Sequence, residues 1–140
     1  MTRFAMVLRR FAVLTAVSVA AAGCGGGSTG NTKTVTAPPG NAVRGKQIFA
    51  QYGCGNCHTF SPARTSATVG PNLDRLAIYA EKAHKQVMDF TRSAITNPPA
   101  PYVPPGFPTN RMPTTFALLM TDQQMSDLVV FLTKSSSRTS

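Results

Sequence analysis

The stretch Cys54-Gly55-Asn56-Cys57-His58 decides the fold of this 140-residue chain. It has the spacing C-x-x-C-H, which is typical of sites where haem is attached covalently. Two thiols three positions apart can each add to one vinyl group of a haem and form two thioether bonds. The imidazole of the next residue, His58, can then ligate the iron from one face. The motif therefore predicts one covalent haem c, with Cys54 and Cys57 as attachment sites and His58 as a metal ligand.

Two other kinds of site share the C-x-x-C spacing. A redox-active dithiol of the thioredoxin type is expected in a βαβ context, and no strand-rich run lies near Cys54. A structural zinc site needs four Cys or His ligands. The remaining candidates are Cys24 and His84, which do not form a second paired cluster. The haem interpretation is therefore favoured over both alternatives.

The first 23 residues have the organisation of a secretory signal peptide. Arg3, Arg9 and Arg10 precede a 12-residue apolar run at positions 11–22. A helix of that length spans about 18 Å, whereas the hydrocarbon core of a bilayer is about 30 Å thick. The run is too short to cross a membrane comfortably. We therefore expect residues 1–23 to be removed after export by the general secretion route.

Cys24 follows the small residues Ala21, Ala22 and Gly23, a junction that resembles the acylation site of bacterial lipoproteins. The usual residue three positions before such a cysteine is Leu, so Ala21 departs from the pattern. The alternative is ordinary cleavage that leaves a free thiol, which would be a liability in an oxidising compartment. We therefore expect a lipid anchor at Cys24, and a location on the outer face of the cytoplasmic membrane, on the periplasmic side or the cell surface.

Residues 24–41 are rich in Gly, Ser, Thr and Asn, which predicts a flexible, lipid-anchored tether. The chain has 14 Lys and Arg residues against 5 Asp and Glu, and loss of residues 1–23 leaves 11 against 5. A positive surplus of this size favours redox partners with acidic docking surfaces, in a salt-dependent way. The basic residues are scattered without a Lys/Arg run, and we expect no nucleic acid partner.

Apolar periodicity predicts a mostly helical domain over residues 42–136, followed by a polar tail at 137–140. The buried side of the first helix is expected to carry Val43, Ile48 and Phe49. No segment alternates as a strand, and no internal repeat is present. The expected helices, the second of them only a short turn, cover residues 42–52, 73–79, 83–96 and 121–134.

The last helix has the clearest start. Thr121 and Gln124 have the spacing of a capping box, and Met120 and Met125 occupy the positions of a hydrophobic staple. An apolar stripe at i, i+3, i+4 and i+7 follows, which predicts a helix with one buried face. The stripe consists of Met125, Leu128, Val129 and Leu132.

A second axial ligand favours electron transfer over the binding of gases or peroxide. Met88, Met120 and Met125 lie at helical spacing, where methionine more often belongs to the core. Met112 instead ends an irregular stretch with six prolines, which lower the entropy cost of fixing a ligand. His84 is the alternative, in a polar stretch typical of a solvated helix face. We expect Met112 to be the second metal ligand.

The chain has a first helix, a C-x-x-C-H motif, a loop with Met112 before a proline, and a capped last helix, in that order. In this arrangement, residues 42–134 resemble a class I cytochrome c. The segment Gly70-Pro71-Asn72-Leu73 matches the family's G-P-x-L pattern. The resemblance implies that the Pro71 carbonyl accepts a hydrogen bond from His58 and so orients it at the haem; a simple turn is the alternative. Gly45 and Phe49 resemble the glycine and aromatic residue of the family's first helix. They imply close packing of that helix against the last one, near residues such as Leu128 and Phe131.

The resemblance implies a small all-α fold in which the N- and C-terminal helices pack together around a covalently attached haem. It also implies an electron carrier rather than an enzyme. The stretch at 95–113 looks most like cytochrome c domains fused to haem–copper oxidase subunits. We therefore expect a carrier of single electrons between membrane-associated respiratory complexes, toward a terminal oxidase. The alternatives are an electron-entry subunit of a larger oxidoreductase and a haem-based gas or redox sensor.

Overall fold

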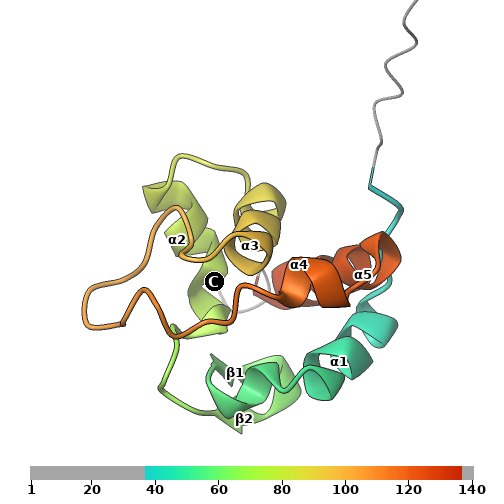
Figure 1. Cartoon of the computed structure of the whole chain (residues 1–140), viewed down its shortest axis with the longest axis horizontal. Coiled ribbons are helices and arrows are strands. Elements are labelled where there is room, and N and C mark those ends of the chain that lie inside the picture. The colour runs from blue at the N-terminus through green and yellow to red at the C-terminus, as the bar shows by residue number, and fades with distance from the viewer. Residues whose placement is uncertain (1–36, 137–140) are drawn as a thin grey trace, which may run out of the picture. The chain divides into compact units, whose positions relative to one another are not determined.

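The computed structural model describes residues 37–136, which fold into five α-helices, three short 3-10 helices and one pair of two-residue strands (Figure 1). The all-α fold class is confirmed. The expected signal peptide, Cys24, most of the expected tether and the polar tail lie outside the described residues. The elements in chain order are α1 (Ala42–Gln51), η1 (Cys54–Asn56), β1 (Thr59–Phe60), η2 (Ser61–Ala63), β2 (Thr65–Ser66), η3 (Leu73–Arg75), α2 (Leu76–Lys82), α3 (Val87–Thr96), α4 (Phe116–Leu119) and α5 (Asp122–Ser136).

Helices α1 and α5 form the most extensive contact between elements of the fold. They approach closely at Gly45, where an added Cβ would lie 2.6 Å from the Cβ of Phe131. The Phe49 and Phe131 rings meet edge to face, with centroids 5.9 Å apart. The expectation that Gly45 allows close helix packing is confirmed. Val43 lies on the opposite side of α1 and is 73% exposed, so its placement on the buried side was wrong.

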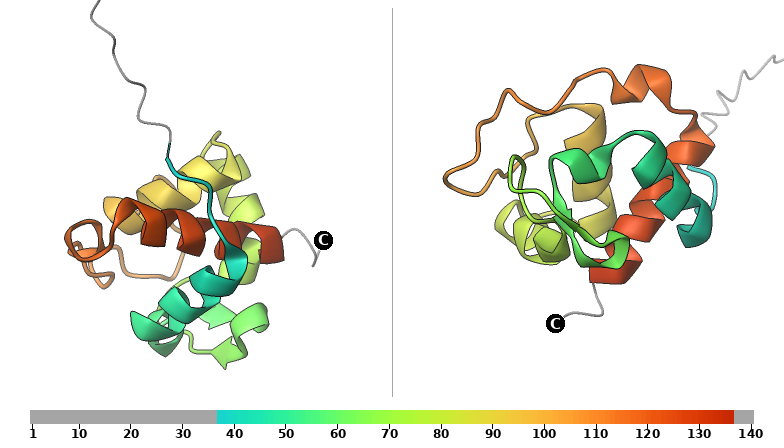
Figure 2. Two further views of the ribbon diagram at one scale, coloured as in Figure 1. Left: turned by 90° about the vertical axis from the view of Figure 1, so that its right-hand side faces the viewer. Right: turned by 90° about the horizontal axis from the view of Figure 1, so that it is seen from below.

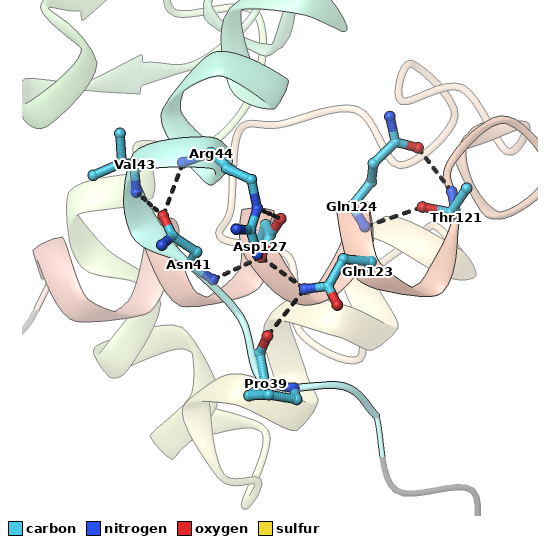
Figure 3. Close-up of polar contacts among 8 residues, drawn as sticks. All are labelled: Pro39, Asn41, Val43, Arg44, Thr121, Gln123, Gln124 and Asp127. Carbon is cyan, nitrogen blue, oxygen red and sulfur yellow. Dashed lines mark hydrogen bonds and ion pairs between the residues drawn. The ribbon is translucent and has the colours of Figure 1, made fainter.

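The buried carboxylate of Asp127 connects α5 to the start of α1 (Figure 3). It accepts hydrogen bonds from the backbone N–H of Asn41 at 2.6 Å and from Gln123 Nε2 at 3.0 Å. It also accepts two from the guanidinium of Arg44. Gln123 in turn donates to the carbonyl of Pro39 at 2.9 Å. The last residues of the expected tether are therefore held against α5, which the local sequence pattern did not indicate.

The start of α5 agrees with its sequence signals. The Gln124 side chain accepts from the Thr121 N–H at 2.9 Å, and Thr121 Oγ1 accepts from the Gln124 N–H at 3.2 Å (Figure 3). Met120 and Met125 are both buried in the hydrophobic core. The predicted capping box is confirmed, and both staple methionines belong to the core.

Two expectations about local structure were wrong. The helix expected from residue 83 begins at Val87, because the Lys85 N–H bonds back to the Ala80 carbonyl and His84 adopts a left-handed φ of 53°. This pattern ends a helix. Met88 lies on the outer face of α3 and is 48% exposed, not in the core. The structure also contains the strand pair β1–β2, whose two-residue strands are too short to show alternation.

Helices α2 and α3 lie at one end of the domain, and α1 lies at the other end together with β1 and β2 (Figures 1 and 2). Helix α5 lies between these two ends. Helix α5 contacts α1, α2 and α3. The long irregular segment between α3 and α4 runs along one side (Figure 2). None of the helices in residues 37–136 is both long and apolar enough to cross a membrane.

Candidate functional site

A cavity of about 280 Å³ lies within the domain, and residues of all five α-helices or their connecting segments line it. Its wall is mainly apolar, with contributions such as Phe90 and Ile95 from α3 and Leu128 and Leu132 from α5. Each residue that the sequence singled out for haem binding in this part of the chain also lines it. These residues are Cys54, Cys57, His58, Pro71 and Met112.

The tight turn of η1 positions the two thiols. Gly53 begins it with a left-handed φ of 66°, and the Cys54 carbonyl accepts from the backbone N–H groups of Cys57 and His58. The two cysteines do not form a disulfide with each other. Burial raises the pKa of the Cys54 thiol to about 11. A redox-active dithiol needs the opposite shift, toward a thiolate at neutral pH, so the direction of the Cys54 shift counts against the thioredoxin-type alternative.

His58 is held by the segment that resembles G-P-x-L. Its Nδ1 lies 2.7 Å from the Pro71 carbonyl oxygen. A carbonyl can only accept, so Nδ1 carries the proton and Nε2 is left as the nitrogen available to a metal. Burial lowers the pKa of His58, while the Pro71 bond opposes that shift. The predicted hydrogen bond between these two residues is confirmed, and the imidazole is kept neutral and oriented.

Gly70 provides the room for this arrangement. An added Cβ at Gly70 would lie 2.5 Å from Cε1 of His58 and 3.0 Å from its Nε2. The Gly70 N–H also donates to the Cys57 carbonyl at 2.7 Å, which ties the segment to the cysteine motif. A larger residue at Gly70 would therefore displace the imidazole.

The structure brings two of the candidate second ligands to the cavity wall and leaves Met88 and His84 outside it. Met112 lies in the cavity wall, brought there by the irregular segment between α3 and α4. Met88 and His84 are exposed and are not part of the wall. Met120 also reaches the wall but belongs to the hydrophobic core. Met112 and Met120 are therefore the two methionines of the described residues that line the cavity.

Several polar residues of the wall were not found from the sequence. They include Tyr52, Tyr79, Tyr102, Thr91 and Arg111. The burial of Tyr79 could have been predicted from helical periodicity, because Tyr79 follows Leu76 by three positions. Both residues are buried on the same face of α2. Tyr102 and Arg111 lie in the irregular segment, where no periodicity indicates which side chains face inward.

The residues present fit a covalently bound haem. Two thiols, a neutral imidazole with a free Nε2 and a thioether open onto one apolar cavity, and this donor set is that of a Met/His-ligated haem c. By contrast, residues 37–136 contain no group of three or more His, Cys, Asp or Glu side chains arranged to hold a metal ion.

Comparisons with known proteins agree with this geometry. The family model described as Cytochrome c matches residues 42–136, which is more than half of the chain. The matched range begins with the first residue of α1 and ends with the last residue of α5, so it includes every wall of the cavity. A search of curated proteins found no match.

Proposed function

The chain belongs to the cytochrome c family, and on that premise we propose that it is a tethered carrier of single electrons between membrane-associated respiratory complexes. Its cofactor is a covalent haem c, as in the family. Bound haem supplies one-electron redox chemistry, and the protein contributes ligands, an apolar pocket and a docking surface.

The observation that carries this proposal is the 2.7 Å contact between His58 and Pro71 in the wall of a cavity that Met112 also lines. In the proposed site, Cys54 and Cys57 hold the haem through two thioethers. His58 would ligate the iron through Nε2, because the hydrogen bond from Nδ1 to the Pro71 carbonyl leaves Nε2 unprotonated and fixes the orientation of the ring. Met112 would provide the second ligand to the haem iron, a pair of protein ligands that suits electron transfer.

Two features support a role on the oxidising side of a respiratory chain. Ligation by Met and His raises the reduction potential relative to ligation by two His residues. An apolar pocket also favours the less charged ferrous state. We expect a positive midpoint potential, suited to delivering electrons to a terminal oxidase. A redox titration of the mature protein tests this role, and a clearly negative potential would exclude it.

The domain surface favours brief contacts with acidic partners. Residues 37–136 carry nine Lys and Arg residues against five Asp and Glu. On α4, whose Phe116 lines the cavity, Leu118 is 87% exposed and offers an apolar contact to a partner. Electron transfer to an acidic partner is expected to slow as ionic strength rises. A rate that does not change with salt would contradict electrostatic docking.

The proposed membrane attachment rests on the sequence around Cys24. After removal of residues 1–23, a lipid on Cys24 would hold the domain near the outer face of the cytoplasmic membrane through the segment at 24–41. Mass spectrometry of the protein purified from its own membranes measures the lipid and the haem in one spectrum. The Cys24→Ser variant is expected to leave the membrane fraction while its haem absorbance stays unchanged.

One experiment separates the carrier from its two alternatives. Carbon monoxide leaves the ferrous spectrum of a carrier unchanged, because both axial positions are occupied. A spectral change in the native protein would indicate a labile sixth ligand, as a gas sensor needs. Stable co-purification with a catalytic subunit would instead indicate an electron-entry subunit of a larger oxidoreductase.

A further inference from the structure

Residues 37–41 form a strap that belongs to the folded domain although it ends the expected tether. The strap passes over α5 before α1 begins (Figure 2, left). Gln123 donates to the Pro39 carbonyl at 2.9 Å, and the Asp127 carboxylate accepts from the Asn41 N–H at 2.6 Å (Figure 3). The Asn41 side chain then accepts from two backbone N–H groups in the first turn of α1. The strap is therefore held to α5 at two points and continues directly into α1.

Gly40 allows the strap to lie directly on α5. A Cβ added at Gly40 would lie 2.6 Å from Cγ2 of Val130 and closer still to the carbonyl oxygen of Ser126. Ser126 and Val130 are both buried. Pro38 and Pro39 restrict the backbone just before this contact, which lowers the entropy cost of holding it. The fit of the strap on α5 therefore depends on these particular residues.

The strap lies on the face of α5 that points away from the cavity. Its contact positions on α5 have the spacing of one helix face and are Gln123, Ser126, Asp127 and Val130. Leu128 and Leu132, which line the cavity, lie on nearly the opposite face. The irregular segment between α3 and α4 also extends on the side away from the strap (Figure 1; Figure 2, right). Helix α5 therefore stands between the strap and the cavity.

Chain length limits how the domain can turn at a membrane. Residues 24–36 alone connect Cys24 to the strap, and they span at most about 45 Å. A compact domain of this size is about 30 Å across, so half of its circumference is about 50 Å. With the strap in place, the chain is too short to reach around the domain. With the strap released, residues 24–41 would span about 60 Å and could do so.

We propose that the strap fixes the point where the membrane tether leaves the domain, on the face of α5 turned away from the haem, so that the anchored protein keeps its haem side off the lipid surface. The proposal rests on the lipid anchor at Cys24 and on the haem site proposed above. Lipid contact is confined to the strap side of α5, and the cavity side stays available to a redox partner.

Hydrogen exchange of the Asn41 amide, measured by NMR on the purified holoprotein, tests whether the strap is held. Gly40→Val releases the strap, because an added Cβ already meets the backbone of α5. Gln123→Ala removes one hydrogen bond and leaves Gly40 in place. Gln47→Ala, at an exposed position of α1, is the control. We expect faster exchange in both strap variants, by about tenfold or more in Gly40→Val, and no change in the control.

Photo-crosslinking to lipid tests the orientation of the anchored domain. A benzophenone amino acid replaces Asp122, which precedes Gln123 on α5, or Thr109, which lies in the cavity wall; both positions are exposed. The lipid-bearing holoprotein is placed in phosphatidylcholine vesicles and illuminated, and mass spectrometry measures the captured lipid. We expect capture from position 122 and none from position 109. In Gly40→Val, capture from position 109 is expected to appear.

Equal capture of lipid from positions 109 and 122 in the otherwise wild-type chain overturns the proposal. An Asn41 amide that exchanges as fast as in an unfolded peptide does so as well, as does a Gly40→Val variant with no capture from position 109. In each of these cases, a lipid on Cys24 and an intact covalent haem would show that the tethered carrier stands while the strap does not orient it. Absence of the lipid from the wild type would overturn the membrane attachment and this orientation together.

Discussion

The carboxylate of Asp127 accepts two hydrogen bonds from the guanidinium of Arg44, at 2.6 Å from Nε and 3.0 Å from Nη2. The two residues lie 83 positions apart, on α5 and α1. The Asp127 side chain is almost fully buried, whereas about half of the Arg44 side chain remains in solvent. The buried carboxylate is therefore compensated partly by a cation and partly by the N–H groups of Asn41 and Gln123.

Replacing Asp127 with Asn is expected to lower the free energy of unfolding. The amide keeps one acceptor oxygen but loses its charge and leaves donors of Arg44 or Gln123 without their partner, at a cost of about 1–3 kcal/mol. Denaturant unfolding of the holoprotein, followed by far-UV circular dichroism, measures the change. Glu81→Gln is the control, because this exposed carboxylate has no comparable contacts. Equal unfolding free energies for the two variants would contradict a structural role for Asp127.

The same carboxylate makes stability depend on pH in acid. The hydrogen bond from Arg44, helped by Asn41 and Gln123, lowers the pKa of Asp127 to about 2, against about 3.9 in an unfolded chain. A depressed folded pKa gives stability that is fully present above the unfolded pKa and is lost as pH falls toward the folded pKa. The stability difference between wild type and Asp127→Asn is expected to shrink from pH 5 to pH 2, by about 2–3 kcal/mol at most. Unfolding curves at several pH values measure it, and a constant difference would refute the assignment.

Gly45→Ala tests the crossing of α1 and α5. Alanine is the better helix former by about 0.5–1 kcal/mol, but its Cβ would lie 2.6 Å from the Cβ of Phe131 and 2.7 Å from the backbone carbon of Asp127. The helices must move apart, and we expect a net destabilisation of about 1–3 kcal/mol. Thermal unfolding compares it with Gln47→Ala, an exposed position on the same helix. A stabilised Gly45→Ala variant would show that the crossing tolerates a side chain.

Met112→Ala tests the second axial ligand. We expect loss of the weak long-wavelength band of thioether-ligated ferric haem, a lower midpoint potential, and binding of carbon monoxide to the ferrous protein. Met88→Ala is the matched control, since Met88 is exposed and lies outside the cavity wall. Met120→Leu keeps an apolar side chain of similar volume at the other methionine of the wall. If the band disappears in Met120→Leu and persists in Met112→Ala, the ligand is Met120.

Local sequence patterns predicted those parts of the fold that depend on near neighbours. The capping box of Thr121 and Gln124 involves residues three positions apart, so the start of α5 was predicted correctly. The end of α2 was not, because the left-handed conformation at His84 occurs at a residue type that does not require it. The buried face of α1 was predicted correctly at Ile48 and Phe49 but not at Val43, which is apolar yet exposed to solvent.

The sequence by itself determined the chemistry of the site. The spacing of Cys54, Cys57 and His58 is local, and together with the lack of a βαβ context or a second Cys/His pair in the sequence it predicts a covalent haem. Only the tertiary structure decided what surrounds that haem. Met112 reaches the wall because the segment between α3 and α4 returns across the cavity, and Tyr79 meets Tyr102 across 23 positions of chain. Such contacts join residues that no period or motif relates, because the packing of distant helices, and not local propensity, sets the distance between them.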